Sequence, residues 1–367
     1  MTTLYIAITV FVVLAFFLQD KKGSYYRTYY LMICFAIMLL LHTFFNPEYS
    51  DNYYYKLGFS EYKSMSFANV VMHNSPSLKA ETGYRILCKL VSYLTSNWVV
   101  CMFVISAIML SGYYYSTKKY SKICWLSVLL IMTGPFVQSL FVLRQHLAVG
   151  VLLLSIPFIL KRDIISYLLL CVLAISFHQT AAIFVPTYFI YNLRRTKVIY
   201  TLFILGFIVL YYYFSFFLTV SASLAMDTAT YGDYYLEIDK NAGSNNKMAL
   251  LMSSILVLRI IIMRKRFFKE GLNKLMSIIV ISATIISIVG IGFIATNRLN
   301  MYYTAMSFLF IPNTFINIQR KKIRYLMCIF YFLFTLFFMV KNLQNESSEV
   351  FWFFFKYTPP VNSVFPY

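Results

Sequence analysis

Apolar runs of about 20 residues recur along most of the chain, and this pattern limits the possible folds more than any other feature. A helix needs about 20 such residues to cross the hydrocarbon core of a bilayer. Hydrophobic residues make up 60% of the 367 residues and charged residues 12%, against about 25% charged residues in soluble domains. The short alternating segments of a membrane barrel are not found. The sequence therefore predicts an all-α, polytopic integral membrane protein.

About twelve transmembrane helices fit this pattern at the required length. Three boundaries between neighbouring spans fall on polar interruptions, at 142–144, 178 and 297–299, where one broken or re-entrant helix is the alternative to two spans. Glycine and proline are sparse and no internal repeat is evident, so residues 1–341 are expected to form one polytopic domain, followed by a tail over 342–367. The predicted spans cover about 3–18, 28–45, 97–116, 122–141, 145–160, 163–177, 179–192, 198–220, 247–264, 274–296, 300–318 and 325–341.

Basic residues predict how these spans are oriented. The net charge is +19, and most Lys and Arg residues lie in alternate short loops, which face the cytoplasm by the positive-inside rule. Both termini and the long loops 46–96 and 221–246 are then extracytoplasmic. No sequence feature of a nucleic-acid-binding module is found, so nucleic acid is not an expected partner. The basic clusters are Lys21–Arg27, Lys118–Lys122, Lys161–Arg162, Arg194–Lys197, Arg264–Lys274 and Arg320–Arg324.

Cysteine and histidine show no metal-binding spacing. The six cysteines are scattered, mostly within apolar runs, and none forms a Cys-x-x-Cys pair, which favours simple packing roles. The four histidines, at positions 42, 73, 146 and 178, also lack ligand spacing. Neither a metal site nor a cofactor is expected.

The long loop 46–96 carries two acidic candidates. Asp51 precedes an aromatic run, Tyr53–Tyr55, and either binds a sugar together with those rings or is a solvated acid beside interface anchors. Apolar residues at helical spacing from Tyr84 to Leu94 predict an amphipathic helix lying on the membrane or on the helical bundle. Glu81 would stand at the start of that helix, either as a favourable first-turn carboxylate or as a catalytic group.

Two arginines interrupt apolar stretches near the predicted outer ends of spans. An arginine at the centre of a spanning helix costs about 2.5–3.5 kcal/mol on insertion scales, so Arg144 and Arg298 need a partner or a ligand, or must reach the headgroups. A guanidinium matches phosphate oxygens in a bidentate way. Tyr302 follows Arg298 by four residues, on the same helical face, and could join that group.

His178 interrupts a third apolar stretch. An imidazole suits general acid–base work near neutral pH, although a hydrogen-bonded histidine inside a helical bundle is the plainer alternative. His146 points to a different helix face from Arg144 and is a weaker candidate. Two arginines, a histidine and two acids on the outer side predict an anionic ligand that enters from the outer leaflet. A lipid pyrophosphate fits better than a nucleotide, because no glycine-rich phosphate loop is present.

Five sequence elements together resemble the EpsG family of bacterial polysaccharide-biosynthesis membrane proteins, which is akin to Wzy-type O-antigen and capsule polymerases. The Arg-Gln and Phe-His elements are the specific ones, and the residues after about 320 are generic. In chain order the elements are Asp51 with its tyrosines, Glu81-Thr82-Gly83-Tyr84, Leu143-Arg144-Gln145-His146-Leu147-Ala148, Phe177-His178-Gln179-Thr180-Ala181-Ala182, and Asn297-Arg298 with Tyr302-Tyr303.

This resemblance implies glycosyl transfer outside the bacterial cytoplasmic (inner) membrane, by a GT-C-like membrane enzyme. Repeat units linked to undecaprenyl pyrophosphate would be joined into O-antigen, capsule or exopolysaccharide, without a cofactor. Arg144 and Arg298 would bind the leaving pyrophosphate. His178 or Glu81 would be the catalytic base, and Asp51, Gln145 and Tyr302 would bind substrate. Membrane lipid, a chain-length regulator and a flippase are the expected partners.

Three other classes of function compete with polymerisation. A flippase for the lipid-linked unit would also bind pyrophosphate, but it should carry charges at mid-membrane and on both sides. The second class is an O-antigen ligase, or an acyltransferase that modifies sugars. The ligase shares the chemistry, and the order of the motifs is what favours a polymerase. A purely structural membrane protein would leave Arg144 and Arg298 without a role.

Overall fold

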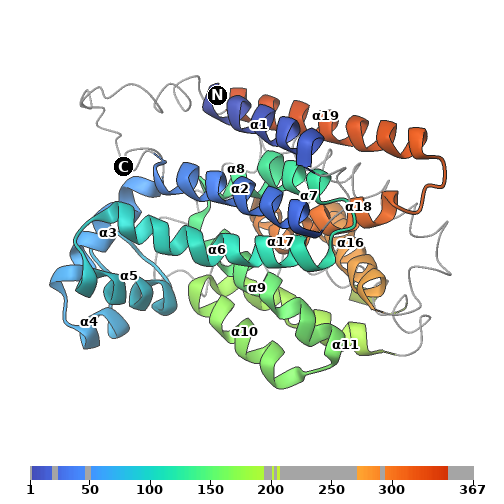
Figure 1. Cartoon of the computed structure of the whole chain (residues 1–367). Coiled ribbons are helices and arrows are strands. Elements are labelled where there is room, and N and C mark those ends of the chain that lie inside the picture. Colours follow the sequence, from blue (N-terminus) through green and yellow to red (C-terminus); the bar gives the residue numbers. More distant parts are fainter. Residues whose placement is uncertain are drawn as a thin grey trace. The chain divides into compact units, whose positions relative to one another are not determined.

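The computed structural model describes residues 2–18, 24–45, 51–193, 201, 205–206, 271–289 and 294–345. All regular structure in these residues is helical (Figure 1). They belong to two compact units. The first comprises residues 1–110, 123–146 and 318–367, and the second comprises residues 111–122 and 147–317.

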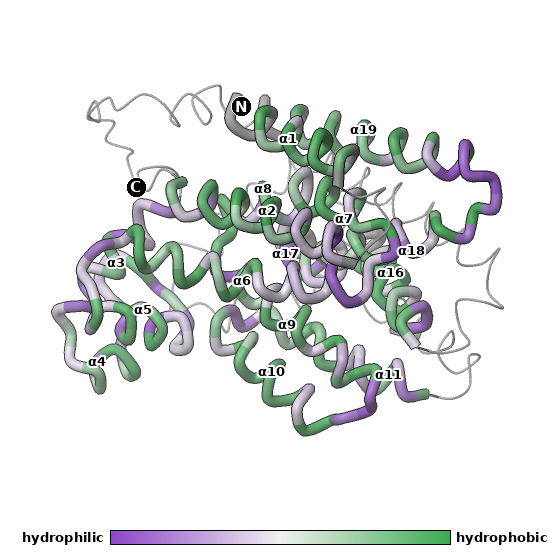
Figure 2. Tube along the Cα trace, viewed as in Figure 1, coloured by the Kyte–Doolittle hydropathy of each residue, from purple (hydrophilic) through white to green (hydrophobic). Residues whose placement is uncertain are grey.

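Long apolar helices form most of the first unit, and α1 and α2 are largely green in the hydropathy view (Figure 2). Their inward residues, such as Phe11, Leu31 and Cys34, are fully buried. The helices are α1 (Thr2–Leu18), α2 (Ser24–Thr43), the part of α6 (Trp98–Tyr120) up to Leu110, α7 (Cys124–Ile131), a π-helix over Met132–Phe136, the short α8 (Val137–Ser139) and α19 (Lys321–Asn345).

Three helices between α2 and α6 form a small subdomain, which we call the cap: α3 (Asp51–Ser64), α4 (Phe67–Met72) and α5 (Thr82–Leu94). Helix α5 packs against both others. The Arg85 guanidinium donates to the Val71 carbonyl in the last turn of α4, and the Lys89 ammonium donates to the Lys63 and Met65 carbonyls at the end of α3. Both cations are buried, and each satisfies carbonyls that a helix end leaves unpaired.

The helix after α7 breaks just before Arg144. Pro135 cannot donate a backbone hydrogen bond, and the chain passes it in a wide π-turn. Helix α8 ends at Ser139, and α9 (Leu143–Lys161) begins after a three-residue interruption. The side-chain amide of Asn52 in the cap donates to the Leu140 carbonyl within this break, at 2.8 Å. The break and the first turn of α9 are therefore tied to the cap.

The second unit contains the remaining described helices. Helices α6 and α9 approach very closely within it, because a Cβ atom built on Gly112 would lie 1.9 Å from the Gly150 carbonyl oxygen. Small residues permit such close helix contacts in membranes. The other elements are α10 (Ile164–Phe177), a 3₁₀ helix over Gln179–Phe184, α11 (Pro186–Asn192), α16 (Leu272–Val289), α17 (Ile294–Thr304) and α18 (Ser307–Phe315).

The prediction of a helical membrane protein is confirmed in part. Three described helices are long and apolar enough to cross a membrane, Tyr25–Thr43, Trp98–Tyr120 and Leu143–Lys161, and they match three predicted spans. Four further predicted spans correspond to shorter apolar helices: Ile6–Ala15, Cys124–Ser139, Ile164–Phe177 and Leu272–Ser287. A total of about twelve spans therefore stays a prediction.

Several predicted boundaries differ from the structure. The predicted span 179–192 is divided into a 3₁₀ helix and the short α11, because Pro186 starts a new helix. The loop 46–96 contains three helices where one was predicted. The predicted span 247–264 and the loop 221–246 lie outside the described residues. The same holds for nearly all of the predicted span 198–220 and of the tail 342–367.

Candidate functional site

Arg144 lies in the first turn of α9, where the helix dipole disfavours a cation. A side chain whose charge opposes the helix dipole at its end stabilises the helix by about 0.3–1 kcal/mol. A basic residue at the N-terminus has the unfavourable sign and destabilises the helix by a similar amount unless a partner offsets it. The Arg144 and Glu81 side chains are only 20% and 17% exposed, and they form an ion pair. This contact joins two elements that lie 63 positions apart in the sequence.

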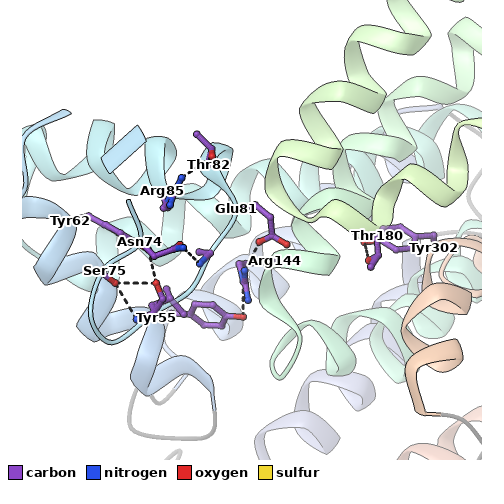
Figure 3. Close-up of polar contacts among 12 residues, drawn as sticks. Tyr55, Tyr62, Asn74, Ser75, Glu81, Thr82, Arg85, Arg144, Thr180 and Tyr302 are labelled. Atoms are coloured by element: carbon purple, nitrogen blue, oxygen red, sulfur yellow. Dashed lines mark hydrogen bonds and ion pairs between the residues drawn. The ribbon is translucent and has the colours of Figure 1, made fainter. Parts of the chain in front are cut away.

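Tyr55 completes the cluster around the Arg144 guanidinium. Nη1 of Arg144 donates to the Glu81 carboxylate, and Nε donates to the Tyr55 hydroxyl at 3.3 Å. The guanidinium carbon also lies 5.7 Å from the centre of the Tyr55 ring, within the range of a cation–π contact. Figure 3 shows the carboxylate and the tyrosine on two sides of Arg144. We call Tyr55, Glu81 and Arg144 the arginine cluster.

The Tyr55 hydroxyl keeps its proton at neutral pH. Burial raises the pKa of Tyr55 above its ordinary value of 10.0, the Arg144 guanidinium opposes the rise, and the carboxylates of Asp51 and Glu81 add to it. The ring of Tyr84 packs against Tyr55 with their centroids 5.6 Å apart, which supports the ring from behind. Tyr55 thus combines a fixed position with a hydroxyl that can both accept and donate.

Glu81 stands where the sequence predicts it, immediately before α5. It is the N-cap residue of that helix, but its side chain makes no capping hydrogen bond and pairs with Arg144 instead. The amphipathic helix predicted over Tyr84–Leu94 is also present as part of α5.

The other predicted residues near Arg144 take different positions. Asp51 is exposed as the first residue of α3, and Gln145 is fully buried. His146 is fully buried as well, on another face of α9, as its spacing from Arg144 predicts.

A second cluster forms in the second unit and is neutral. The Thr180 and Tyr302 hydroxyls lie 2.9 Å apart (Figure 3). The Tyr303 hydroxyl donates to the Ile183 carbonyl at 2.6 Å. The rings of Phe184 and Tyr303 also pack together. These contacts bring together the Phe-His and Asn-Arg elements, which are about 120 positions apart. We call Thr180, Tyr302 and Tyr303 the tyrosine cluster.

His178 and Arg298 flank the tyrosine cluster along the chain. His178 is the half-buried C-cap residue of α10, and its backbone N–H donates to the Ala174 carbonyl. Arg298 is exposed in the first half of α17, although the sequence suggested a break between spans there. Tyr302 is fully buried. A direct role of Tyr302 beside the Arg298 guanidinium, and the meeting of these residues with Arg144, stay predictions.

Two contacts were not predicted from the sequence: the contact between Tyr55 and Arg144, and the contact between Thr180 and Tyr302. Tyr55 belongs to the run of three tyrosines, and helical periodicity separates it from Tyr53 and Tyr54, which are exposed in α3. Its position one helical turn after Asp51 was the available signal. Among the described residues, no group of three or more His, Cys, Asp or Glu side chains could hold a metal ion.

Comparison with known families identifies the chain. The EpsG family matches residues 28–358. The chain belongs to the EpsG family. Membership indicates a membrane protein of polysaccharide biosynthesis with a polymerase-type, glycosyltransferase-like function. No curated protein and no solved structure matches the chain significantly. The match includes every element of both clusters.

Proposed function

We propose that this EpsG-family protein joins oligosaccharide repeat units carried on undecaprenyl pyrophosphate into a longer polysaccharide. The observation that supports this most directly is the arginine cluster. A half-buried guanidinium at a helix start, held by one carboxylate and one tyrosine, is suited to exchange its partner for a phosphate group.

The surroundings of Arg144 favour an anion. Helix α9 begins at Leu143 and α5 begins at Thr82, and neither helix has an acidic residue in its first turn. The Glu81–Arg144 contact links these two helix starts. Each N-terminus contributes a partial positive charge and unpaired N–H groups. Since Glu81 is the carboxylate paired with Arg144, a pyrophosphate that bears more charge can compete with it.

The reaction would proceed by exchange of partners. The donor's pyrophosphate binds the Arg144 guanidinium, with the Tyr55 hydroxyl beside it. A hydroxyl of the acceptor sugar attacks the anomeric carbon, the bond from that carbon to the pyrophosphate oxygen breaks, and lipid pyrophosphate leaves with the electron pair. Arg144 then stabilises charge that grows on the leaving group, an effect worth about 10²–10³ in rate per donor.

Glu81 and His178 are the two candidates for the base that takes the hydroxyl proton. An ion-paired carboxylate is a poor proton acceptor, because the neighbouring cation favours its charged form. When pyrophosphate draws Arg144 away, Glu81 becomes more basic at the moment the base is needed. His178 remains the alternative. In both cases Arg298 is a second phosphate contact and Asp51 binds sugars, whereas the fully buried Gln145 and Tyr302 support the site without touching the sugars.

The proposal includes a location and partners. The chain acts in the bacterial inner membrane, with its termini and the cap on the extracytoplasmic side, as the distribution of Lys and Arg predicts. A flippase delivers the lipid-linked unit, and a chain-length regulator limits the product.

The test uses the full-length protein in proteoliposomes with a single purified lipid-linked repeat unit from the host. A polymerase yields a ladder of regularly spaced glycans and releases one lipid pyrophosphate for each bond formed, without a nucleotide sugar. A ligase transfers the unit only when a different acceptor lipid is added. A flippase changes the exposure of the unit to an added glycosidase and makes no ladder. Either of the last two results overturns the proposal.

A further inference from the structure

The outward face of α5 in the cap is apolar, unlike that of a helix on a soluble protein. Its inward face carries the cations Arg85 and Lys89 among buried apolar residues such as Tyr84, and its outward face also carries large apolar side chains. Leu90, Tyr93 and Leu94 are 51%, 61% and 88% exposed. These three lie at helical spacing with the half-buried Ile86 and Leu87, and no charged side chain interrupts them. A surface helix facing water carries charged or polar side chains on its outward face.

Backbone carbonyls within the cap bind the two inward cations, which explains their position. The outward apolar face of α5 is the surface that still needs a binding partner. Arg85 and Lys89 donate to carbonyls at the ends of α4 and α3, which fixes the rotation of α5 about its axis. With that rotation, Leu90 and Leu94 must point away from the cap. Exposure of such a face to water is unfavourable, since burial of each apolar side chain is a main source of stability.

The cap is also held close to the start of a membrane span. Only Thr95, Ser96 and Asn97 separate α5 from α6, whose residues Trp98–Tyr120 are long and apolar enough to cross a membrane. Four residue steps extend at most about 14 Å. The connection is ordered, because Asn97 accepts a hydrogen bond from the Val99 N–H, and Phe59 of α3 packs against the Trp98 ring at 5.8 Å.

We infer that the outward face of α5, formed by Ile86, Leu87, Leu90, Tyr93 and Leu94, binds the bilayer surface at the headgroup boundary. Lipid is the occupant that the tether to Trp98 places within reach, and tyrosine is enriched at this depth of membranes. The Lys89 ammonium lies 4.9 Å from the centre of the Tyr93 ring, which leaves the other side of that ring for lipid. The cap would thereby rest on the membrane from which a lipid-linked substrate arrives.

A quenching experiment on the full-length protein tests this inference. Leu94→Cys is labelled with an environment-sensitive fluorophore, and the protein is reconstituted in phospholipid vesicles with or without lipids that carry a nitroxide near the headgroup. The six native cysteines are buried, so the unmodified chain reports background labelling. Ser60→Cys, at an exposed position of α3, is the matched control, and Tyr93→Cys is a second position on the α5 face.

We expect nitroxide lipids to quench the labels at positions 94 and 93 at least three times more than the label at position 60. Equal quenching at all three positions overturns the inference. Cross-linking of two copies through Leu94→Cys, without lipid quenching, overturns it in favour of a second copy of the chain as the occupant. The readout is independent of catalysis, so the inference can fail while the proposed polymerase activity stands.

Discussion

The arginine cluster and the tyrosine cluster are assembled in the same way but differ in charge. Each joins sequence elements that are far apart, and each contains a tyrosine hydroxyl in contact with a polar side chain. The arginine cluster contains a cation and a carboxylate that are both partly exposed, whereas the tyrosine cluster contains neutral hydrogen bonds around fully buried Tyr302. A half-buried ion pair can exchange partners, while a buried neutral hydrogen bond is suited to hold elements together.

Because of this difference, we expect Arg144 and Arg298 to contribute unequally to stabilisation of the transition state. Arg144 lies within a network that fixes its guanidinium, and Arg298 is exposed on α17. A pre-positioned charge in a partly water-excluded site stabilises a transition state more than an exposed one, because water screens the exposed charge. Substitutions in the two clusters should therefore separate by size of effect.

The largest effect is expected for Arg144→Ala. We expect the polymerisation rate to fall about 1000-fold, because the leaving pyrophosphate loses its fixed donor. Arg144→Lys should recover only part of the rate, since an ammonium cannot donate to two phosphate oxygens in the same fork. The rate of lipid pyrophosphate release measures both variants, and a membrane blot checks protein abundance. Normal abundance with an unchanged rate would remove Arg144 from the site.

Glu81→Gln should reduce the rate about 100-fold if Glu81 is the base, within the range of about 10²–10⁴ for general bases. Glu61→Gln is the matched control. Glu61 is another carboxylate of the cap, but its partners are the Ser77 hydroxyl at 2.5 Å and the Ser77 N–H at 3.1 Å, and we place it outside the reaction. If both variants reduce the rate equally, the effect of Glu81 is on the stability of the cap, and His178 becomes the leading base.

Arg298→Ala should have a smaller effect, about tenfold, or about 1.4 kcal/mol of transition-state stabilisation. An exposed guanidinium makes a screened contact with phosphate, so this loss should shrink further as the salt concentration is raised. The Arg144→Ala defect should depend less on salt. A loss for Arg298→Ala as large as that for Arg144→Ala would contradict the comparison between the two clusters.

Tyr302→Phe removes one hydroxyl from the tyrosine cluster and leaves its ring. We expect a loss of about 1 kcal/mol in stability, the usual net value of one hydrogen bond, seen as a lower melting temperature with a nearly normal rate. Tyr303→Phe, which removes the hydrogen bond to Ile183, should behave alike. A large rate loss for Tyr302→Phe but not for Tyr303→Phe would instead place the Tyr302 hydroxyl in contact with substrate.

The smallest effect concerns pH and the cap. Burial of Glu61 opposes its ionisation, but the hydrogen bonds from Ser77 outweigh it, so the pKa of Glu61 lies below its usual value of 4.5. A carboxylate with a lowered pKa contributes stability above its ordinary pKa and loses it as pH falls through the folded-state value. Wild-type protein should therefore lose more thermal stability than Glu61→Gln between pH 5 and pH 3, and identical pH profiles would contradict this assignment.

Part of this architecture could be predicted from local pattern. Apolar runs of about 20 residues identify helices such as α2, α6 and α9, because length and hydrophobicity are properties of the segment itself. The break before Arg144 and the amphipathic character of α5 were also evident. The helices α3 and α4 were missed, because their mixed composition provides a weak periodic signal and they depend on capping by Arg85 and Lys89.

The sequence by itself determined that the chain is helical and membrane-associated, which residues carry charge in apolar surroundings, and which family it belongs to. Tertiary structure decided the partners: Glu81 and Tyr55 for Arg144, Thr180 for Tyr302, and an outward direction for Leu90 and Leu94. The physical reason is the distance along the chain over which each effect acts. Hydrophobic periodicity acts over one or two helical turns, whereas ion pairs and hydrogen bonds between elements depend on how distant helices pack and rotate against each other.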